Sequence, residues 1–180
     1  MWYEVIYRIL SIINYVVLFL LITPVFVQVC YILFCWVKKT KYPHSDKKAK
    51  VAFLIPAHNE EAVVGNTVKA LINNLHYPKD LFDIFVVADN CTDKTGDIAK
   101  QAGAIVLTRE DKDPSHRAAL YPLKYGIDYI LNQNAYDLVV HLDADNLINP
   151  EFLNLINDCY QQGNDFIRPY EGSTNGDQNF

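Results

Sequence analysis

Hydrophobic residues form one long block near the N-terminus, followed by a series of short runs. The block, residues 9–37, contains no charged side chain. It is long enough to cross the hydrocarbon core of a bilayer once as a helix, but too short to cross it twice. A cleaved signal peptide would have a shorter apolar region ending in small residues, whereas this block ends in the bulky residues 34–37. We therefore predict an N-terminal tail and one transmembrane helix over residues 1–37.

Short apolar runs alternate with helical patterns after residue 50. Continuous apolar runs over residues 51–56, 83–88, 104–107 and 138–142 are typical of buried parallel strands. Helical spacing follows the first run, continues at residues 95–101, 123–131 and 150–160, and gives an apolar stripe in two of these segments. The stripes comprise Val64, Val68, Leu71 or Ile72, and Leu75 in one helix, and Leu123, Ile127, Ile130 and Leu131 in the other. The alternation predicts an α/β domain over residues 51–170, with a mostly parallel sheet and helices on both faces.

A basic segment, residues 38–50, joins the predicted membrane helix to this domain, and a polar tail, residues 171–180, follows it. The N-terminal side of the membrane helix has only Arg8, opposed by Glu4. Because positive residues favour the cytoplasmic side, we predict a single-pass membrane protein with a cytoplasmic domain. The positive residues on the C-terminal side of the helix are Lys38, Lys39, Lys41, Lys47, Lys48 and Lys50. A solvated linker is an alternative explanation for these lysines.

Overall composition narrows the possible partners. The 180 residues carry 16 Lys or Arg against 21 Asp or Glu, a net charge of -5. No basic surface for a phosphate backbone is expected, which disfavours nucleic acid as a partner. An acidic domain that binds a diphosphate needs a metal ion or a few well-placed cations. The four cysteines have no CxxC spacing, so neither a disulfide framework nor a zinc site is indicated.

In an open α/β sheet, ligands bind beyond the carboxyl ends of the strands. The loop after the first strand reads Pro56-Ala57-His58-Asn59-Glu60-Glu61 and has no glycine, so the dinucleotide-binding fingerprint is absent. A purely structural explanation is that Asn59 caps the next helix while Glu60 and Glu61 complement its dipole.

Asp89 directly follows the second strand. A carboxylate at this position can accept an N–H group from a nucleobase. The neighbouring Asn90, Thr92 and Asp93 are explained by turn formation and helix capping alone.

The fourth strand ends in a pair of acids. Strand periodicity places His141, Asp143 and Asp145 on one face, so the two carboxylates converge. Hard oxygen ligands of this kind suit Mg²⁺ or Mn²⁺ bridging a diphosphate, although turns are also rich in Asp. We expect His141 to be a hydrogen-bonded structural residue.

Together, these three loops resemble glycosyltransferase family 2, whose nucleotide-sugar-binding α/β fold is called GT-A. Residues 51–61 resemble the first strand and P-A-x-N-E segment, and residues 84–95 resemble the second strand with its D-x-x-x-D-x-T turn. Asp143-Ala144-Asp145 resembles the metal motif, and the resemblance extends over residues 51–163. It implies roles for seven positions: Pro56, Ala57, Asn59 and Glu60 border the nucleoside, Asp89 recognises the base, usually uracil, and Asp143 and Asp145 serve ribose and metal.

The resemblance implies an inverting transfer of sugar from a UDP-sugar to a glycan or lipid acceptor, with Mg²⁺ or Mn²⁺. An N-terminal span before such a domain also resembles processive polysaccharide synthases and related membrane-bound transferases. Many relatives carry a G-K-G-x-A-L segment after the third strand. Here the sequence is Arg117-Ala118-Ala119-Leu120-Tyr121-Pro122-Leu123, and Arg117 or Lys124 takes the place of the lysine.

No catalytic base is recognisable in the chain. The resemblance places the acceptor half and its aspartate base beyond Phe180, so we expect this chain alone to bind donor without useful turnover. We predict that Asp158 and Asp165 are solvated surface acids, and nothing in the sequence fixes Glu171. The alternative is a non-catalytic membrane-tethered module that binds nucleotide sugar or a partner. A nucleotidyltransferase is disfavoured because its glycine- and arginine-rich first loop is missing.

Overall fold

The computed structural model describes residues 2–35 and 42–169. The chain divides into two compact units, residues 1–41 and 42–180, which are described separately. Lys38, Lys39 and Lys41 of the basic segment lie outside the described residues, as does the polar tail with Glu171.

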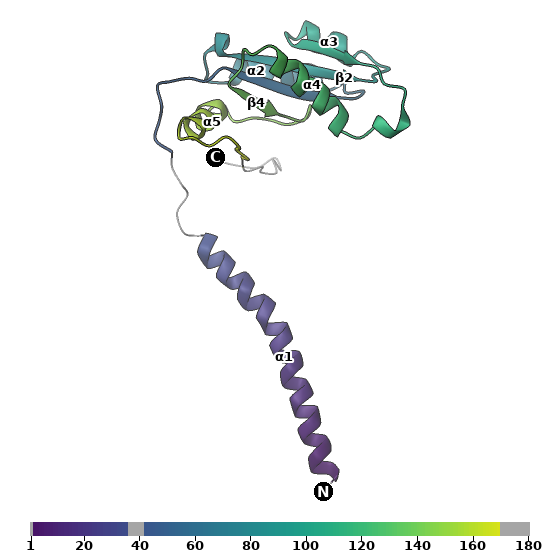
Figure 1. Cartoon of the computed structure of the whole chain (residues 1–180), viewed down its shortest axis with the longest axis vertical. Helices are drawn as coiled ribbons and strands as arrows, with labels where there is room; N and C mark the ends of the chain where they lie inside the picture. The colour runs from purple at the N-terminus through teal and green to yellow at the C-terminus, as the bar shows by residue number, and fades with distance from the viewer. Residues whose placement is uncertain (1, 36–41, 170–180) are drawn as a thin grey trace. The chain divides into compact units, whose positions relative to one another are not determined.

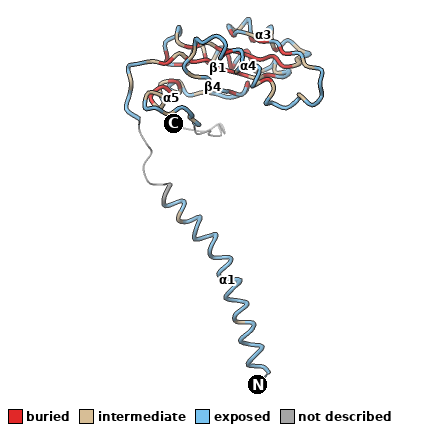
Figure 2. Tube along the Cα trace, in the orientation of Figure 1, coloured by how far each residue is buried: buried red, intermediate tan, exposed pale blue. Residues whose placement is uncertain are grey.

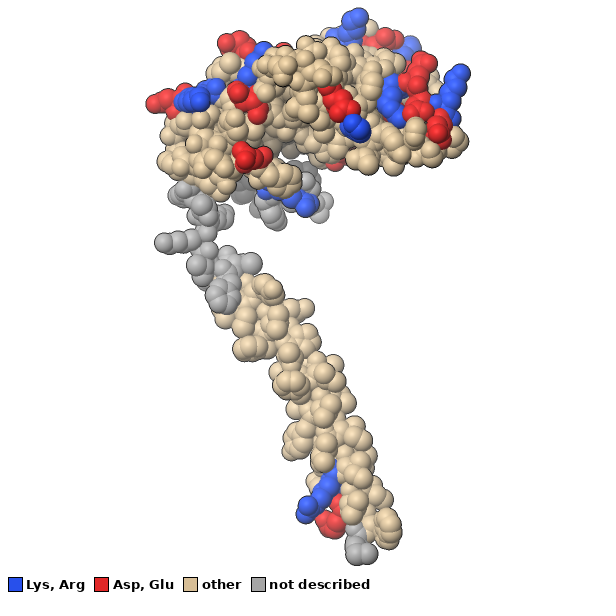
Figure 3. Space-filling model, viewed as in Figure 1, with Lys and Arg blue, Asp and Glu red and all other residues tan. Residues whose placement is uncertain are grey.

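The N-terminal unit is one helix, α1 (Trp2–Cys35). Its stretch Trp2–Leu33 contains an 18-residue window with a mean hydropathy of 2.6, and the helix is long and apolar enough to cross a membrane. Figure 2 shows that almost all of its residues with described burial are exposed. Its only charged residues, Glu4 and Arg8, lie close to the N-terminal end (Figure 3). The apolar surface is thus unpaired within the described unit, as expected of a helix that is solvated by lipid.

The globular unit is built on four parallel strands (Figure 1). They are β1 (Val51–Ala57), β2 (Phe82–Asp89), β3 (Ile105–Arg109) and β4 (Leu138–His141). Their order in the sheet is β3-β2-β1-β4, with β1 and β2 in the centre. The apolar runs in the sequence correctly predicted this parallel sheet, and all four strands therefore end at the same edge.

Helices cover both faces of the sheet, as predicted. Residues of α2 (Val64–Asn74), α3 (Thr95–Gln101) and α5 (Phe152–Gln161) pack with one set of strand side chains, including Phe53 and Val86. On the other face, α4 (Leu120–Asn132) packs against the alternate strand residues. Short 3-10 helices, Lys79–Leu81 and Pro114–His116, precede β2 and α4. Because a parallel strand is covered on both faces, β1 is buried almost throughout.

Details of α4 correct the predicted stripe. Leu123 and Ile127 pack against the second core and Ile130 is buried, but Leu131 is 59% exposed. Gly126 faces Leu54 so closely that an added Cβ would overlap it. The helix axis therefore lies tight on β1, and Leu131 falls just outside the covered arc.

Residues 44–49 lie against α5 and are termed here the strap. Asn157 is fully buried; it accepts a hydrogen bond from the backbone N–H of Ala49 (2.9 Å) and donates to the Lys47 carbonyl (3.0 Å). Asp158 accepts from the Ser45 N–H (3.0 Å) and pairs with the imidazole of His44. The prediction that Asp158 is a solvated surface acid is therefore wrong, because it is only 6% exposed.

Candidate functional site

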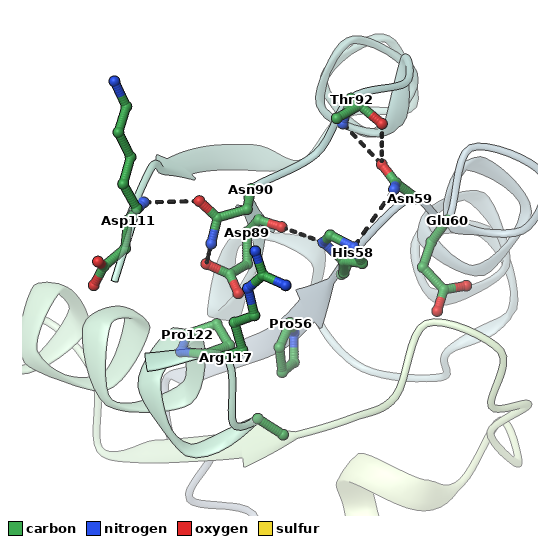
Figure 4. A pocket seen from close by; sticks show the side chains of 13 residues that line it. Pro56, His58, Asn59, Glu60, Asp89, Asn90, Thr92, Asp111, Arg117 and Pro122 are labelled. Carbon is green, nitrogen blue, oxygen red and sulfur yellow. Dashed lines mark hydrogen bonds between the residues drawn. The ribbon is translucent and has the colours of Figure 1, made fainter. Parts of the chain in front are cut away.

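A cavity of about 860 Å³ opens where β1, β2 and β3 end (Figure 4). This volume lies within the range of small-molecule sites, about 300–1,000 Å³. The cavity is lined by residues from the loops after these three strands and from the start of α4. They are Pro56, Ala57, His58, Asn59, Glu60, Asp89, Asn90, Thr92, Asp111, Lys112, Arg117, Ala119 and Pro122. Five predicted nucleoside-binding residues, Pro56, Ala57, Asn59, Glu60 and Asp89, thus share one cavity.

Asn59 connects the loop after β1 to the loop after β2. Its Oδ1 accepts from the backbone N–H of Thr92 (2.8 Å) and from the Thr92 hydroxyl (3.3 Å). Asn59 has a φ of 55°, a left-handed conformation that asparagine tolerates better than most residues. The capping explanation is wrong, since α2 begins later, at Val64, without a side-chain cap.

The two glutamates after Asn59 also serve this connection. The Glu60 N–H donates to the hydroxyl of Thr95 (2.8 Å), and the Lys94 N–H donates to the carboxylate of Glu61 (3.0 Å). Neither glutamate lies within α2, so complementing the dipole of its first turn does not account for them. Asp93 accepts from the hydroxyl and the N–H of Thr95, and the hydroxyl bond is the main reason that the pKa of Asp93 is lowered.

Asp89 lines the cavity and is only 8% exposed. Its Oδ1 accepts from the guanidinium of Arg109, at the end of β3, and from the amide of Asn90 (3.2 Å). No described residue hydrogen-bonds to Oδ2. One carboxylate oxygen therefore anchors the side chain, and the other is left to accept a hydrogen bond from a ligand.

The same arginine fixes the loop between β3 and α4. Its second nitrogen donates to Asp111 (2.6 Å), which also accepts from the imidazole of His116 (2.8 Å). The N–H of Asp113, followed by His116 and with a smaller contribution from Arg109, lowers the pKa of Asp111. Tyr121 packs against this group, with its ring centroid 4.4 Å from that of His116 and 5.7 Å from the guanidinium carbon of Arg109.

Two cations from this loop line the cavity, Lys112 and Arg117. Neither has an ion-pair partner within 4.0 Å among the described residues. Figure 4 shows Arg117 extending from the start of the α4 region toward the part of the cavity that holds Asp89. Lys124, the other candidate for the missing lysine, instead pairs with Asp128 on the exposed side of α4 (2.6 Å). Of the two candidates, only Arg117 lines the cavity.

The paired acids after β4, Asp143 and Asp145, are not among the residues that line this cavity. Exposure alternates past the strand end, with Asp143 and Asp145 exposed and Leu142 and Ala144 buried. The Ala144 carbonyl accepts from the hydroxyl of Thr67 on α2, which anchors the loop. The nearest His141 nitrogen is 3.8 Å from Asp143, too far for a hydrogen bond.

The two carboxylates fit a metal ion that takes few protein ligands. The described residues contain no group of three or more His, Cys, Asp or Glu side chains that could hold a metal ion. Mg²⁺ commonly takes one or two protein carboxylates and completes its shell with water and substrate phosphates. Asp143 and Asp145 match that donor set rather than a site made only of protein ligands.

Several lining residues were not predicted from the sequence, chiefly His58, Asp111 and Lys112. Arg109, whose guanidinium donates to the Asp89 carboxylate, was also not predicted. The position of these residues at a strand end was the sequence feature that could have identified them. Arg109 ends the third strand, and Asp111 and Lys112 follow it, so this loop met the same criterion as the other three.

Comparison with known proteins adds independent information. A sequence model of the family described as "Glycosyltransferase like family 2" matches residues 49–176. The probable glycosyltransferase YdaM of Bacillus subtilis is 58% identical over 52 residues, which is 29% of this chain and 12% of that protein. The beta-monoglucosyldiacylglycerol synthase of a Nostoc species is 36% identical over 63 residues, 33% of this chain and 13% of that protein. The matched regions are therefore a small part of these relatives.

Among solved structures, the mannosyltransferase PcManGT from Pyrobaculum calidifontis, in complex with GDP-Man and Mn²⁺, has a similar fold. The TM-score is 0.54 at 19% identity, over 72% of this chain and 38% of that one. The similarity supports the same arrangement of sheet and helices, the GT-A fold.

Proposed function

The chain belongs to the family described as glycosyltransferase like family 2, and on this basis we propose that it is the donor-binding part of an inverting glycosyltransferase. The donor is a nucleotide-diphospho-sugar, and we propose a UDP-sugar. The acceptor is a glycan or a lipid. The residues proposed to bind the nucleoside are Pro56, Ala57, Asn59, Glu60 and Asp89, all of which line the cavity.

The main support for this proposal is the hydrogen bonding of the Asp89 carboxylate. Its Oδ1 is held by Arg109 and Asn90, while Oδ2 of this cavity-lining residue has no described partner. An ionised carboxylate can only accept hydrogen bonds. It therefore favours a base that presents an N–H donor, such as uracil at N3, over one that presents a lone pair there, such as cytosine.

The diphosphate is proposed to lie near Arg117 and Lys112. Both line the cavity without a described ion-pair partner, so they have charge available for an anion. A guanidinium suits phosphate oxygens especially well, because its donors form a planar fork. Arg117 thus takes the role of the lysine in the G-K-G-x-A-L segment.

We further propose that Asp143 and Asp145 hold Mg²⁺ or Mn²⁺ together with the diphosphate, and that Asp143 also serves the ribose. A divalent cation there stabilises negative charge on the departing nucleoside diphosphate. Both side chains are exposed, and their loop is fixed to α2 through the bond from Thr67 to the Ala144 carbonyl. The carboxylates therefore project from an anchored backbone.

Calorimetric titration of the full chain with UDP, with and without MnCl₂, tests the function. We expect binding that weakens by roughly tenfold or more without the metal, or in the Asp143→Ala/Asp145→Ala double variant, because the phosphate charge is then uncompensated. The double variant Asp46→Ala/Asp80→Ala is a matched control, since both acids are exposed but lie ahead of β1 and β2 rather than after the end of a strand. Equal heats for wild type and the Asp143/Asp145 variant contradict the metal assignment, and no UDP binding at all contradicts the donor assignment.

The acceptor side is proposed to lie outside the residues described here. Asp158 is excluded as the base for the acceptor hydroxyl, because it is buried and bound to the strap. The printed name of the Nostoc relative, a beta-monoglucosyldiacylglycerol synthase, supports a lipid as one acceptor class. We propose that α1 crosses the membrane once and that the globular unit is cytoplasmic.

A further inference from the structure

The end of β2 is supported unequally by its two neighbours. Pairing between β1 and β2 ends at Ala57 and Ala88, whereas pairing between β2 and β3 continues to Asp89 and Arg109. On the β3 side, the backbone bond from Asn90 to Arg109 (2.8 Å) and the guanidinium both hold this end of the strand. On the β1 side the ladder has already ended.

A histidine ring makes the shortest connection on the β1 side, where the Cys91 thiol also contacts the carbonyls of Ala57 (3.5 Å) and Asp89 (3.8 Å). His58 Nδ1 lies 2.7 Å from the backbone carbonyl oxygen of Asp89. A carbonyl can only accept, so Nδ1 carries the proton and donates. His58 Nε2 lies 3.5 Å from the amide nitrogen of Asn59, whose oxygen is bound to Thr92 in the loop after β2. Figure 4 shows the ring between Asp89 and Asn59, linked to both.

We propose that His58 is a positioning residue for base recognition: its Nδ1–H group fixes the backbone of Asp89 and thereby aims the free carboxylate oxygen into the cavity. This proposal rests on the proposed function, because it concerns how Asp89 meets the nucleobase. Recognition groups must be held within about 0.5 Å of their working position. With the bond from His58 removed, the Asp89 carbonyl keeps only the long contact from the Cys91 thiol (3.8 Å) besides the support from β3, and the carboxylate is free to shift toward Arg109.

A matched pair of substitutions isolates this bond. In His58→Asn, the side-chain amide nitrogen lies close to the former position of Nδ1 and can still donate to the Asp89 carbonyl. In His58→Gln, the amide nitrogen lies closer to the former position of Nε2 and is too far along the side chain to do so. The two replacements have the same functional group and differ in where the donor stands. His76→Gln is the control, since this histidine pairs with Glu151 and does not line the cavity.

The experiment measures the Kd values of UDP and CDP for the full chain with MnCl₂, together with the melting temperature of each variant. We expect wild type and His76→Gln to prefer UDP. His58→Gln should lose about three- to tenfold of that preference, in proportion to one hydrogen bond, and His58→Asn should lose less. If His58 has a purely structural role, its substitution lowers the melting temperature or the fraction of protein that binds nucleotide, without changing the ratio of the two Kd values.

The outcomes distinguish the positioning role of His58 from base recognition by Asp89. If wild type binds UDP in preference to CDP and the Asn and Gln variants keep the same ratio, or lose it equally, the role of His58 is overturned. If wild type binds neither nucleotide, or binds them equally, the proposed base recognition by Asp89 fails instead.

Discussion

Arg109 and Asp89 form a buried ion pair across the ends of neighbouring strands. Arg109 is 9% exposed and Asp89 is 8% exposed, and the strand register places the two residues opposite each other. Removing one partner of such a pair leaves the other charge buried and unpaired, which costs more stability than the pair itself contributes. The arrangement therefore constrains any substitution at Asp89: the replacement must still accept from Arg109.

Asp89→Asn meets that constraint and should change base preference. Its amide oxygen can still accept from Arg109, which leaves the amide N–H₂ group facing the cavity. That group donates to cytosine N3 but not to the N–H of uracil. We expect UDP binding to weaken about tenfold and the UDP-to-CDP preference to shrink or reverse, as measured by calorimetry.

The control for this change is Asp83→Asn. Asp83 lies near the opposite end of the same strand, where it accepts from the hydroxyl of Tyr136 (2.8 Å). It should leave both nucleotide affinities unchanged. An unaltered UDP-to-CDP ratio in Asp89→Asn contradicts the base-recognition role.

Arg117→Met and Lys124→Met test which cation meets the diphosphate. Arg117 lines the cavity, whereas Lys124 is paired with Asp128 on α4. Loss of a charge-assisted hydrogen bond typically costs about 1.5–3 kcal/mol. We therefore expect Arg117→Met to weaken UDP binding by about ten- to a hundredfold while uridine binding is unchanged, and Lys124→Met to affect neither. Equal effects of the two variants, measured by calorimetry, contradict the assignment of Arg117.

The fold could be predicted from the sequence because its strands are buried on both faces. Short continuous apolar runs such as 51–56 are typical of strands that are covered on both faces, and the helices between them favour parallel pairing. Errors arose where burial depends on tertiary placement. Leu131 satisfies the helical spacing but falls outside the arc that faces β1.

The candidate site was only partly predictable, for a similar reason. Asp89 and Asn59 stand at strand ends and could be found by position alone. The partners of Asn59 could not, because its choice of Thr92 over a cap on α2 depends on how two loops meet. The sequence predicts a surface acid at Asp158 because it does not show that residues 44–49 fold back against α5.

The strap should contribute measurably to stability through Asn157. This side chain is fully buried and meets a backbone donor of Ala49 and a backbone acceptor of Lys47. Asn157→Ala leaves both groups unpaired, at a cost of about 2–4 kcal/mol. Urea unfolding followed by circular dichroism measures the change. Asn154→Ala, on the same helix but only partly buried, should cost less because water can reach its partners, and equal losses contradict this account.

Tyr77 predicts how stability responds to alkaline pH. Burial is the main reason that the pKa of its phenol is raised to about 12, and its hydroxyl donates to the Ala49 carbonyl (2.8 Å). The unfolded state releases this proton near pH 10, so the contribution of Tyr77 to stability is complete below pH 10 and is lost as the pH rises toward 12. Tyr77→Phe should lose less stability than wild type between these two values in denaturant titrations. Parallel losses in both proteins contradict the prediction.

The orientation of the membrane helix is the remaining proposal that can be tested directly. Six lysines follow the apolar block within residues 38–50, whereas Arg8 on the other side is opposed by Glu4. Of the described lysines, Lys48 donates to Asn154 and Lys50 lies 3.8 Å from Asp83, so both also serve the globular unit. Their folded-state contacts do not cancel the topological effect, because positive residues act while the helix inserts.

Trypsin applied to sealed vesicles distinguishes the two orientations. The loop between β3 and α4 offers exposed cleavage sites at Lys112 and Arg117. With a cytoplasmic globular unit, right-side-out vesicles should protect this loop and inverted vesicles should expose it, and detergent should make it accessible in both. Replacing the six lysines by glutamine while changing Glu4 to Lys reverses the charge bias and should increase the fraction accessible in right-side-out vesicles. Cleavage of the unaltered chain in right-side-out vesicles, without detergent, contradicts the cytoplasmic location.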